Sequence, residues 1–149
     1  MHTPGVDMAS GSLGQGLSPG IGMALGARLR GKDFRVVVVL GDGEIQEGQV
    51  WEAAMAAAHY RLDNLVAIVD WNKIQLSDFI EKAMPMDPVP DKWRAFGWQV
   101  RECDGHDVAA ILHALEELRQ VRGRPAVLLA HTVKGKGVSF IRWASPSRT

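Results

Sequence analysis

Short apolar runs rich in β-branched residues alternate along this chain with longer segments of helical character. Val36 to Leu40 is an unbroken apolar run, and Leu65 to Val69 is a second one. Runs without polar alternation are typical of parallel strands that are covered on both faces. Further strands are predicted at Trp98 to Glu102 and at Ala126 to Ala130. We therefore expect a sheet whose first two strands are buried on both faces.

Helical segments fall between these strands. An alanine-rich helix is predicted from Gln49 to Arg61, and an amphipathic helix from Val108 to Val121. A glycine-rich N-terminal segment leads into a helix that ends at Gly31, with Ser18 as its N-cap and Pro19 at its first position. This alternation predicts an α/β fold with a mostly parallel sheet and helices on both faces.

The stretch from Asp78 to Pro90 breaks the alternation, because its prolines favour an irregular loop over regular structure. A short helix is predicted after it, from Trp93 to Phe96. No internal repeat and no linker divides the 149 residues, so we expect a single domain that spans residues 1–149.

Composition excludes several classes of function. Lys plus Arg and Asp plus Glu number 17 each, so no net charge draws the chain to nucleic acid or to an anionic membrane. No apolar run is long enough to span a bilayer. The single cysteine, Cys103, cannot form an internal disulfide. These features predict a cytoplasmic protein that binds neither nucleic acid nor membrane.

Candidate chemistry lies at the ends of the first two strands. Gly41-Asp42-Gly43 follows the first strand, and Asn72 follows the second. Ligands of open α/β sheets bind at the carboxyl ends of the strands. A carboxylate and an amide oxygen suit Mg²⁺, and the two glycines with the helix near Gly48 favour phosphate groups. The alternative is a pair of turns that only reverse the chain, since Gly-Asp-Gly is common in turns.

Several motifs resemble the transketolase family. Asp42 and Asn72 are separated by 72 − 42 = 30 residues, as in the family's thiamine-diphosphate signature. The similarity covers residues 3 to 140 and is closest to the N-terminal subunits of split transketolases. The segments that carry it are Thr3 to Asp7, Ser10 to Gly16, Gly41 to Ala53, Asp104 to Asp107 and Lys134 to Gly137.

The resemblance implies residue roles. Asp42, Asn72 and the backbone carbonyl of Ile74 would bind Mg²⁺, and the backbone at Gly43 and Glu44 would contact the diphosphate. Leu13 would lie beside the thiazolium ring, next to Ser12, where the family has proline. The full set of implied cofactor-binding residues is Gly11, Ser12, Leu13, Gly41, Asp42, Gly43, Glu44, Asn72 and Ile74.

No catalytic residue is assigned to this chain. The resemblance implies that Glu47 belongs to a proton network that joins two cofactors across a dimer interface. The alternative for Glu47 is an acidic residue at a helix N-terminus, favoured by the helix dipole.

The implied reaction moves a two-carbon ketol unit from a ketose phosphate to an aldose phosphate. We expect the pyrimidine-binding and C-terminal domains to lie outside this chain. Activity is therefore expected only with a C-terminal subunit that carries them, in a hetero-oligomer with a dimeric core. Residues 141–149 depart from a histidine-bearing loop of the family, and the chain is interpreted as shortened at both ends. The alternatives are the α subunit of a thiamine-dependent 2-oxo-acid dehydrogenase, or a non-catalytic remnant or assembly protein.

Overall fold

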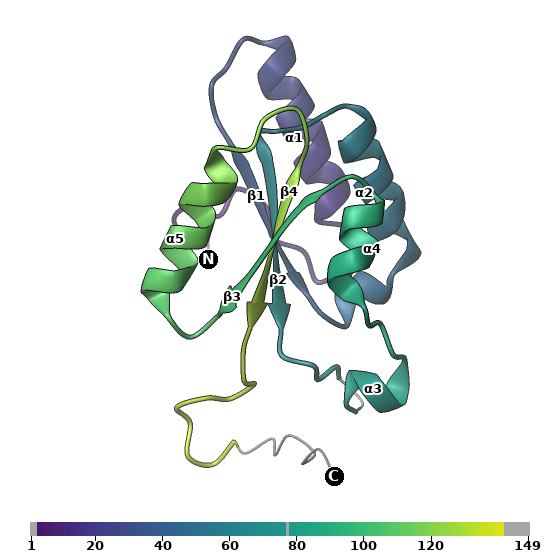
Figure 1. The fold of residues 1–149 in the computed structure, drawn as a ribbon, viewed down its shortest axis with the longest axis vertical. Helices are drawn as coiled ribbons and strands as arrows, with labels where there is room; N and C mark the ends of the chain where they lie inside the picture. The colour runs from purple at the N-terminus through teal and green to yellow at the C-terminus, as the bar shows by residue number, and fades with distance from the viewer. Residues whose placement is uncertain (1–2, 77, 142–149) are drawn as a thin grey trace.

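The computed structural model describes residues 3–76 and 78–141. Residues 1, 2, 77 and 142–149 lie outside this description, and with them almost all of the C-terminal segment expected to depart from the family pattern. The described residues form one sheet (Figure 1). Its strands are β1 (Val36–Gly41), β2 (Leu65–Trp71), β3 (Gln99–Asp104) and β4 (Ala126–His131).

The strands lie in the order β1-β2-β4-β3, and each neighbouring pair is parallel. The last strand in sequence, β4, therefore lies between β2 and β3 and joins them. Gly41 at the end of β1 is opposite Asp70 of β2, which in turn is opposite Ala130 of β4. The predicted parallel α/β fold is confirmed, and the carboxyl ends of β1 and β2 meet at one edge of the sheet.

Helices cover both faces of the sheet, as predicted (Figure 1). On one face, α1 (Leu17–Leu29), α2 (Gly48–His59) and α4 (Val89–Ala95) enclose the larger hydrophobic core. On the other face, α5 (Val108–Arg119) covers a smaller core that includes residues of β2 and β4. Burial of each large apolar side chain contributes about 1.5–3 kcal/mol, so both layers stabilise the sheet that positions the strand ends.

Strand β1 is buried on one face only, so the prediction of two covered faces is wrong for it. Val38 is 8% exposed and packs against α1, where a Cβ at Gly20 would lie 2.6 Å from Cγ2 of Val38. Val37 and Val39 point the other way and are 55% and 68% exposed. The reason is strand order: β1 is at the edge of the sheet, beyond the reach of α5.

Helix α1 begins at Leu17 with Gly16 as its N-cap, so the prediction that Ser18 caps the helix is wrong. Pro19 lies in the first turn, where backbone amides have no partner within a helix, and its missing N–H is therefore tolerated. The predicted end is confirmed, because Gly31 adopts a φ of +61° directly after the last turn.

The prediction of an irregular loop from Asp78 to Pro90 is wrong in part. A short helix, α3 (Ile80–Ala83), forms within it, and α4 begins at Val89 rather than at Trp93. Pro90 falls in the first turn of α4, where its fixed φ suits a helix. Here proline starts a helix instead of excluding one.

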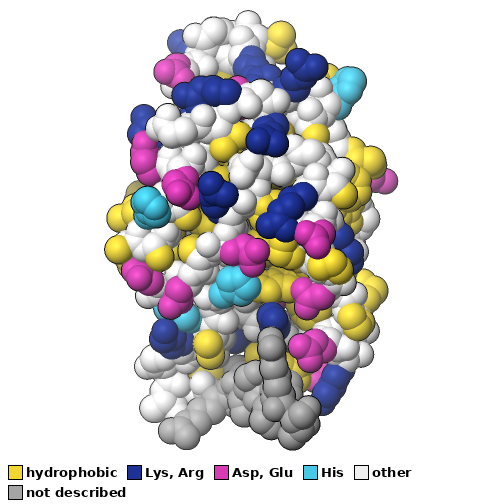
Figure 2. Space-filling view, viewed as in Figure 1, with side chains coloured by type: hydrophobic (Ala, Val, Ile, Leu, Met, Phe, Trp, Pro, Cys, Tyr) yellow, Lys and Arg dark blue, Asp and Glu magenta, His cyan; other side chains and the backbone are white. Residues whose placement is uncertain are grey.

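Charged side chains are interspersed on the face shown in Figure 2, where Lys and Arg lie beside Asp and Glu. This arrangement agrees with the balance of 17 basic and 17 acidic residues. Among the described residues, no helix has the length and apolar character needed to cross a membrane.

Candidate functional site

The carboxyl ends of β1 and β2 bring the two predicted site segments together. Gly41 is opposite Asp70 in the β1–β2 ladder, so Asp42 and Asn72 each follow the paired ends of neighbouring strands. The backbone amide of Lys73 donates a hydrogen bond to Oδ2 of Asp42 and links the two segments directly. The residues that the sequence places 30 positions apart therefore form one cluster.

Asp42 is the buried acid of this cluster. Its side chain is 2% exposed, and Oδ1 accepts a 2.8 Å hydrogen bond from the amide of Gly43. Burial raises the pKa of Asp42 above its ordinary value, and the nearby charge of Asp70 adds to this, although backbone hydrogen bonds from Lys73 and Gly43 act in the opposite direction. A carboxylate whose charge is disfavoured in this way favours a cation beside it.

Residues 72–74 form a compact turn beside Asp42. Oδ1 of Asn72 accepts a 3.0 Å hydrogen bond from the amide of Ile74, and its Nδ2 donates to Oδ2 of Asp70 at 3.2 Å. Lys73 adopts a φ of +63°, and Ile74 is 6% exposed and forms an isolated β-bridge with Phe79. These bonds fix the turn in a conformation that aims the Lys73 amide at Asp42.

The donor set fits a hard divalent cation. A carboxylate from Asp42, an amide oxygen from Asn72 and a carbonyl oxygen from Ile74 are the oxygen ligands that Mg²⁺ prefers. In the described part of the chain, no three His, Cys, Asp or Glu side chains gather to hold a metal. A metal at this site would therefore depend on neutral oxygens and on the phosphates of a ligand, which is how Mg²⁺ is commonly bound.

The Gly-Asp-Gly turn passes into a short 3₁₀ helix, η1 (Glu44–Gln46), and then into α2. Gly43 has an ordinary helical conformation, with φ −68° and ψ −32°, so its small size rather than its flexibility is required. The N-cap of α2 is Glu47, which is exposed and makes no side-chain capping bond. The amides at the start of α2 remain the positive end of a twelve-residue helix.

The glycine-rich segment that contains Gly11, Ser12 and Leu13 lies against the same turn. Oε1 of Glu44 accepts a 2.9 Å hydrogen bond from the amide of Gly14, which joins the segment to the end of β1. The side chain of Leu13 is 60% exposed and remains available to a ligand. All the sequence-predicted binding segments are thus adjacent in the fold.

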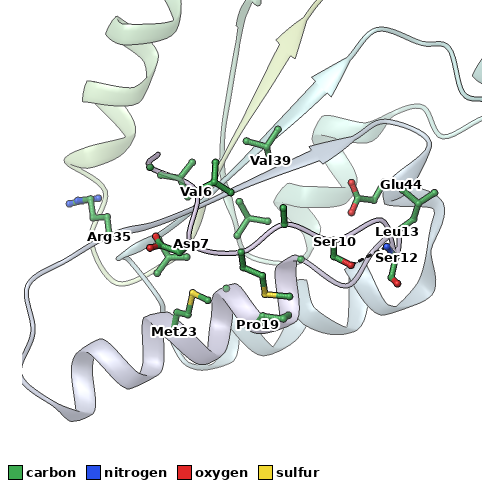
Figure 3. Close-up of a pocket in the computed structure, with 18 of the residues that line it drawn as sticks. Val6, Asp7, Ser10, Ser12, Leu13, Pro19, Met23, Arg35, Val39 and Glu44 are labelled. Atoms are coloured by element: carbon green, nitrogen blue, oxygen red, sulfur yellow. Dashed lines mark hydrogen bonds between the residues drawn. The ribbon is translucent and has the colours of Figure 1, made fainter. Parts of the chain in front are cut away.

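A groove of about 660 Å³ runs along the free edge of β1, between the N-terminal residues 5–13 and α1 (Figure 3). Leu13, Ser12 and Glu44 line one end of it, where Figure 3 shows them close together. Asp42 and Asn72 are not among its lining residues, so the groove adjoins the strand-end site without containing it.

Sequence reasoning missed two residues that build this cluster. Lys73 acts through its backbone amide, which any residue type except proline provides, so no sequence signal marks it. Gln49 lies within α2, where its Nε2 donates a 3.0 Å hydrogen bond to the carbonyl of Leu13. A glutamine in a helix carries no pattern that indicates such a contact 36 residues away.

Comparison with known families identifies one match over nearly the whole chain. The family described as "Transketolase, thiamine diphosphate binding domain" matches residues 1–143.

Among curated proteins, the chain is similar to the 6-deoxy-6-sulfo-D-fructose transketolase subunit of Clostridium sp. (strain MSTE9). The two are 46% identical over 139 residues, which are 93% of this chain and 50% of that protein. An apulose-4-phosphate transketolase subunit of Actinobacillus succinogenes shows the same identity and the same coverage. The chain therefore spans about half the length of these curated relatives.

Solved structures agree with this match. Transketolase from Campylobacter jejuni superposes with a TM-score of 0.80 at 31% identity, over 90% of this chain and 22% of that one. A transketolase from Pichia stipitis, in complex with sedoheptulose 7-phosphate, superposes with a TM-score of 0.81 at 34% identity, over 87% of this chain and 21% of that one.

Proposed function

We propose that this chain, which belongs to the transketolase family, forms the binding site for Mg²⁺ and for the diphosphate of the cofactor. The enzyme would be a transketolase built from two kinds of subunit. Its thiamine diphosphate binding domain, residues 1–149, would be a single domain. The pyrimidine-binding and C-terminal domains would belong to the partner subunit. The relatives named as transketolase subunits support this division of the enzyme.

The observation that carries the proposal is the link between Asp42 and the turn at residues 72–74. The carboxylate of Asp42, which is 2% exposed and has a raised pKa, accepts a hydrogen bond from the backbone of the turn that contains Asn72 and Ile74. We propose that Asp42, Asn72 and the carbonyl of Ile74 hold Mg²⁺. Such a cation would lower the electrostatic cost of the buried Asp42 charge and would bind the diphosphate oxygens.

The remaining binding residues would hold the diphosphate and the thiazolium ring of the cofactor. The backbone at Gly43 and Glu44, together with the N-terminus of α2, would contact the diphosphate. Gly41 would let the backbone approach the phosphates, and the segment Gly11 to Leu13 would place the thiazolium ring. Bound thiamine diphosphate supplies the electron sink for two-carbon transfer, so this chain's residues bind and orient it rather than perform the bond chemistry.

The reaction we propose transfers a two-carbon ketol unit from a ketose phosphate to an aldose phosphate. The two relatives are named for 6-deoxy-6-sulfo-D-fructose and for apulose 4-phosphate. A sulfonate and a phosphate are both anionic groups, which supports an anionic sugar as the substrate class.

The partner would be a C-terminal subunit, and the assembly a hetero-oligomer with a dimeric core. Glu47 is exposed at the start of α2, with no capping bond to occupy its carboxylate. Its exposure supports a contact with another subunit, where it would join a proton network between two cofactors. We also propose a cytoplasmic location, because Cys103, the single cysteine, is a free thiol.

Calorimetry tests the metal and cofactor assignment. Thiamine diphosphate is titrated with Mg²⁺ into the native chain, into Asp42→Ala and into the isosteric Asp42→Asn. Loss of a direct metal ligand should weaken binding by at least roughly tenfold, because even indirect partners of metal ligands matter that much. The matched control is Asp33→Ala, an exposed acid before β1, which should bind as the native chain does.

Equal binding by both Asp42 variants and the native chain would show that the metal assignment is wrong. A ketol-transfer assay addresses the partner. The chain alone should be inactive and should gain activity when its partner is added. Activity of the isolated chain would contradict the proposed division of the enzyme.

A further inference from the structure

A single peptide group in the glycine-rich segment is held at both ends by side chains from the Gly-Asp-Gly region. The amide of Gly14 donates to Oε1 of Glu44 at 2.9 Å. The carbonyl of Leu13 accepts from Nε2 of Gln49 at 3.0 Å. The Leu13 carbonyl and the Gly14 amide belong to the same peptide plane, so the two side chains together fix its orientation.

Glu44 connects this peptide to the strand that carries Asp42. Its second oxygen, Oε2, accepts a 2.9 Å hydrogen bond from the amide of Gly41, the last residue of β1. The carboxylate thus bridges two backbone amides that are far apart in sequence. Hydrogen bonds to a charged acceptor are about twice as strong as neutral ones, so this bridge is a firm connection.

The packing around Gly14 leaves no room for the segment to slide. Gly14 is buried and has a φ of +78°, a conformation that favours glycine. A Cβ at this position would lie 2.9 Å from Nε2 of Gln49 and 2.9 Å from Cβ of Glu47. The peptide is therefore pressed directly against the start of α2.

The residue before this peptide is free to meet a ligand. Leu13 is 60% exposed although its own carbonyl is fixed, so its backbone is held while its side chain faces open space. An apolar contact that is ordered in advance costs less conformational entropy on binding than one that must be ordered by the ligand.

We propose that Glu44 and Gln49 are positioning residues that clamp the Leu13–Gly14 peptide and so prepare Leu13 for the ring of the cofactor. This rests on the proposed function, because it assumes that Leu13 contacts the thiazolium ring. It differs from the backbone contact with diphosphate that the family resemblance implies for Glu44. The carboxylate of Glu44 binds two backbone amides instead of facing the diphosphate, whose negative charge it would repel.

A clamp that positions Leu13 should affect the affinities for two ligands differently, which a contact with only a structural role would not do. Inorganic pyrophosphate contains the diphosphate but has no ring. Removal of the clamp should therefore weaken thiamine diphosphate and leave pyrophosphate unaffected, both measured with Mg²⁺. Gln49→Glu removes the donor to the Leu13 carbonyl, and Glu44→Met, whose side chain has a similar size, removes both acceptor oxygens.

The first experiment needs no ligand. Amide hydrogen exchange at Gly14 should become roughly 10- to 150-fold faster in Glu44→Met, as expected for the loss of a hydrogen bond to a charged acceptor. Glu81→Gln, an exposed acid of α3, is the charge control and should leave Gly14 exchange unchanged. An unchanged Gly14 rate in Glu44→Met would overturn the clamp.

The second experiment compares ligands by calorimetry. Thiamine diphosphate should bind each clamp variant roughly 2- to 12-fold more weakly, which corresponds to ordering one side chain. The control for Gln49→Glu is Gln46→Glu, because Nε2 of Gln46 donates in the same way to the carbonyl of Met84 on another loop. This control should bind both ligands as the native chain does.

The outcomes separate the two proposals. If the binding of both ligands weakens equally in Glu44→Met and Gln49→Glu, the residues act on the diphosphate and the clamp is refuted. If the native chain fails to bind thiamine diphosphate even with its partner subunit present, the proposed function fails and the cofactor role of Leu13 fails with it. A selective loss for thiamine diphosphate, with faster exchange at Gly14, supports the clamp.

Discussion

Replacement of Gly43 by alanine tests whether the Gly-Asp-Gly turn needs glycine for space rather than for conformation. Gly43 has φ −68° and ψ −32°, which alanine adopts without strain. An added Cβ would, however, lie 2.9 Å from Cβ of Gln75 and 3.7 Å from its Cα. The turn at residues 72–75 would have to move away from the end of β1 to admit it.

The expected cost follows from this overlap. Insertion of a methyl group into a packed contact costs about 1–3 kcal/mol. Alanine also reduces the conformational entropy of the unfolded chain, which stabilises the folded state by about 0.4–1 kcal/mol. The midpoints of these two ranges give a net destabilisation of about 1–2 kcal/mol. For a chain of this size, each kcal/mol lowers Tm by about 2–4 °C. We expect Gly43→Ala to unfold roughly 2–8 °C below the native chain.

Thermal unfolding of the ligand-free protein, followed by circular dichroism, measures this shift. Gly41→Ala is the matched control from the same motif, because the nearest atom to its added Cβ is Cβ of Glu44 at an ordinary 3.8 Å. Its Tm should stay close to that of the native chain. Equal shifts for the two variants, or an unchanged Tm for Gly43→Ala, would refute the packing argument.

Two further predictions concern acid stability and the open face of β1. Burial raises the pKa of Asp63, but hydrogen bonds from the Gly123 amide and from Arg28 outweigh it and set the pKa below 3.8. The ionised form therefore stabilises the fold above about pH 3.8, and urea unfolding of native and Asp63→Asn chains should converge as the pH falls below that value. Val38→Thr should lower the free energy of unfolding by about 1–3 kcal/mol, because it buries a hydroxyl. Val39→Thr should change the free energy of unfolding by less than about 0.5 kcal/mol, because Val39 is exposed. If urea titration shows the same loss of stability for both variants, the face of β1 that carries Val39 is covered.

The location of the site was predictable because its signals are local. The apolar runs that end at Leu40 and Val69 identify strands, and the residues directly after them carry the polar groups. Parallel pairing then places Asp42 and Asn72 at one edge, as the ladder between Gly41 and Asp70 confirms. Their roles in binding Mg²⁺ and diphosphate stay predictions.

The exposure of β1 was not predictable from its own residues. Five consecutive apolar residues, Val36 to Leu40, are compatible with a central strand or an edge strand. Which of these occurs depends on strand order, and that order is decided by contacts between segments distant in sequence. The sheet places β1 at an edge, so Val37 and Val39 keep one face open in the described part of the chain.

The clamp was hidden for a related reason. Glu44 and Gln49 contact residues that precede them by 30 and 36 positions. Their side chains are common at the start of a helix, where solvent is the usual partner. Only the approach of the glycine-rich segment gives them another function, and no periodicity in either segment indicates that approach.

The strand order also determines when the sheet can form during synthesis of the chain. β4 lies between β2 and β3, so its pairing with β2 cannot begin until Ala126 has been made, 126 − 71 = 55 residues after the end of β2 at Trp71. At about 5–20 residues per second, translation of this interval takes roughly 3–11 s. Throughout that time the nascent chain presents an unpaired edge of β2, which is a template for association with other chains. A pause by the ribosome within this interval would prolong that exposure, and chaperone binding would be most useful to the chain there.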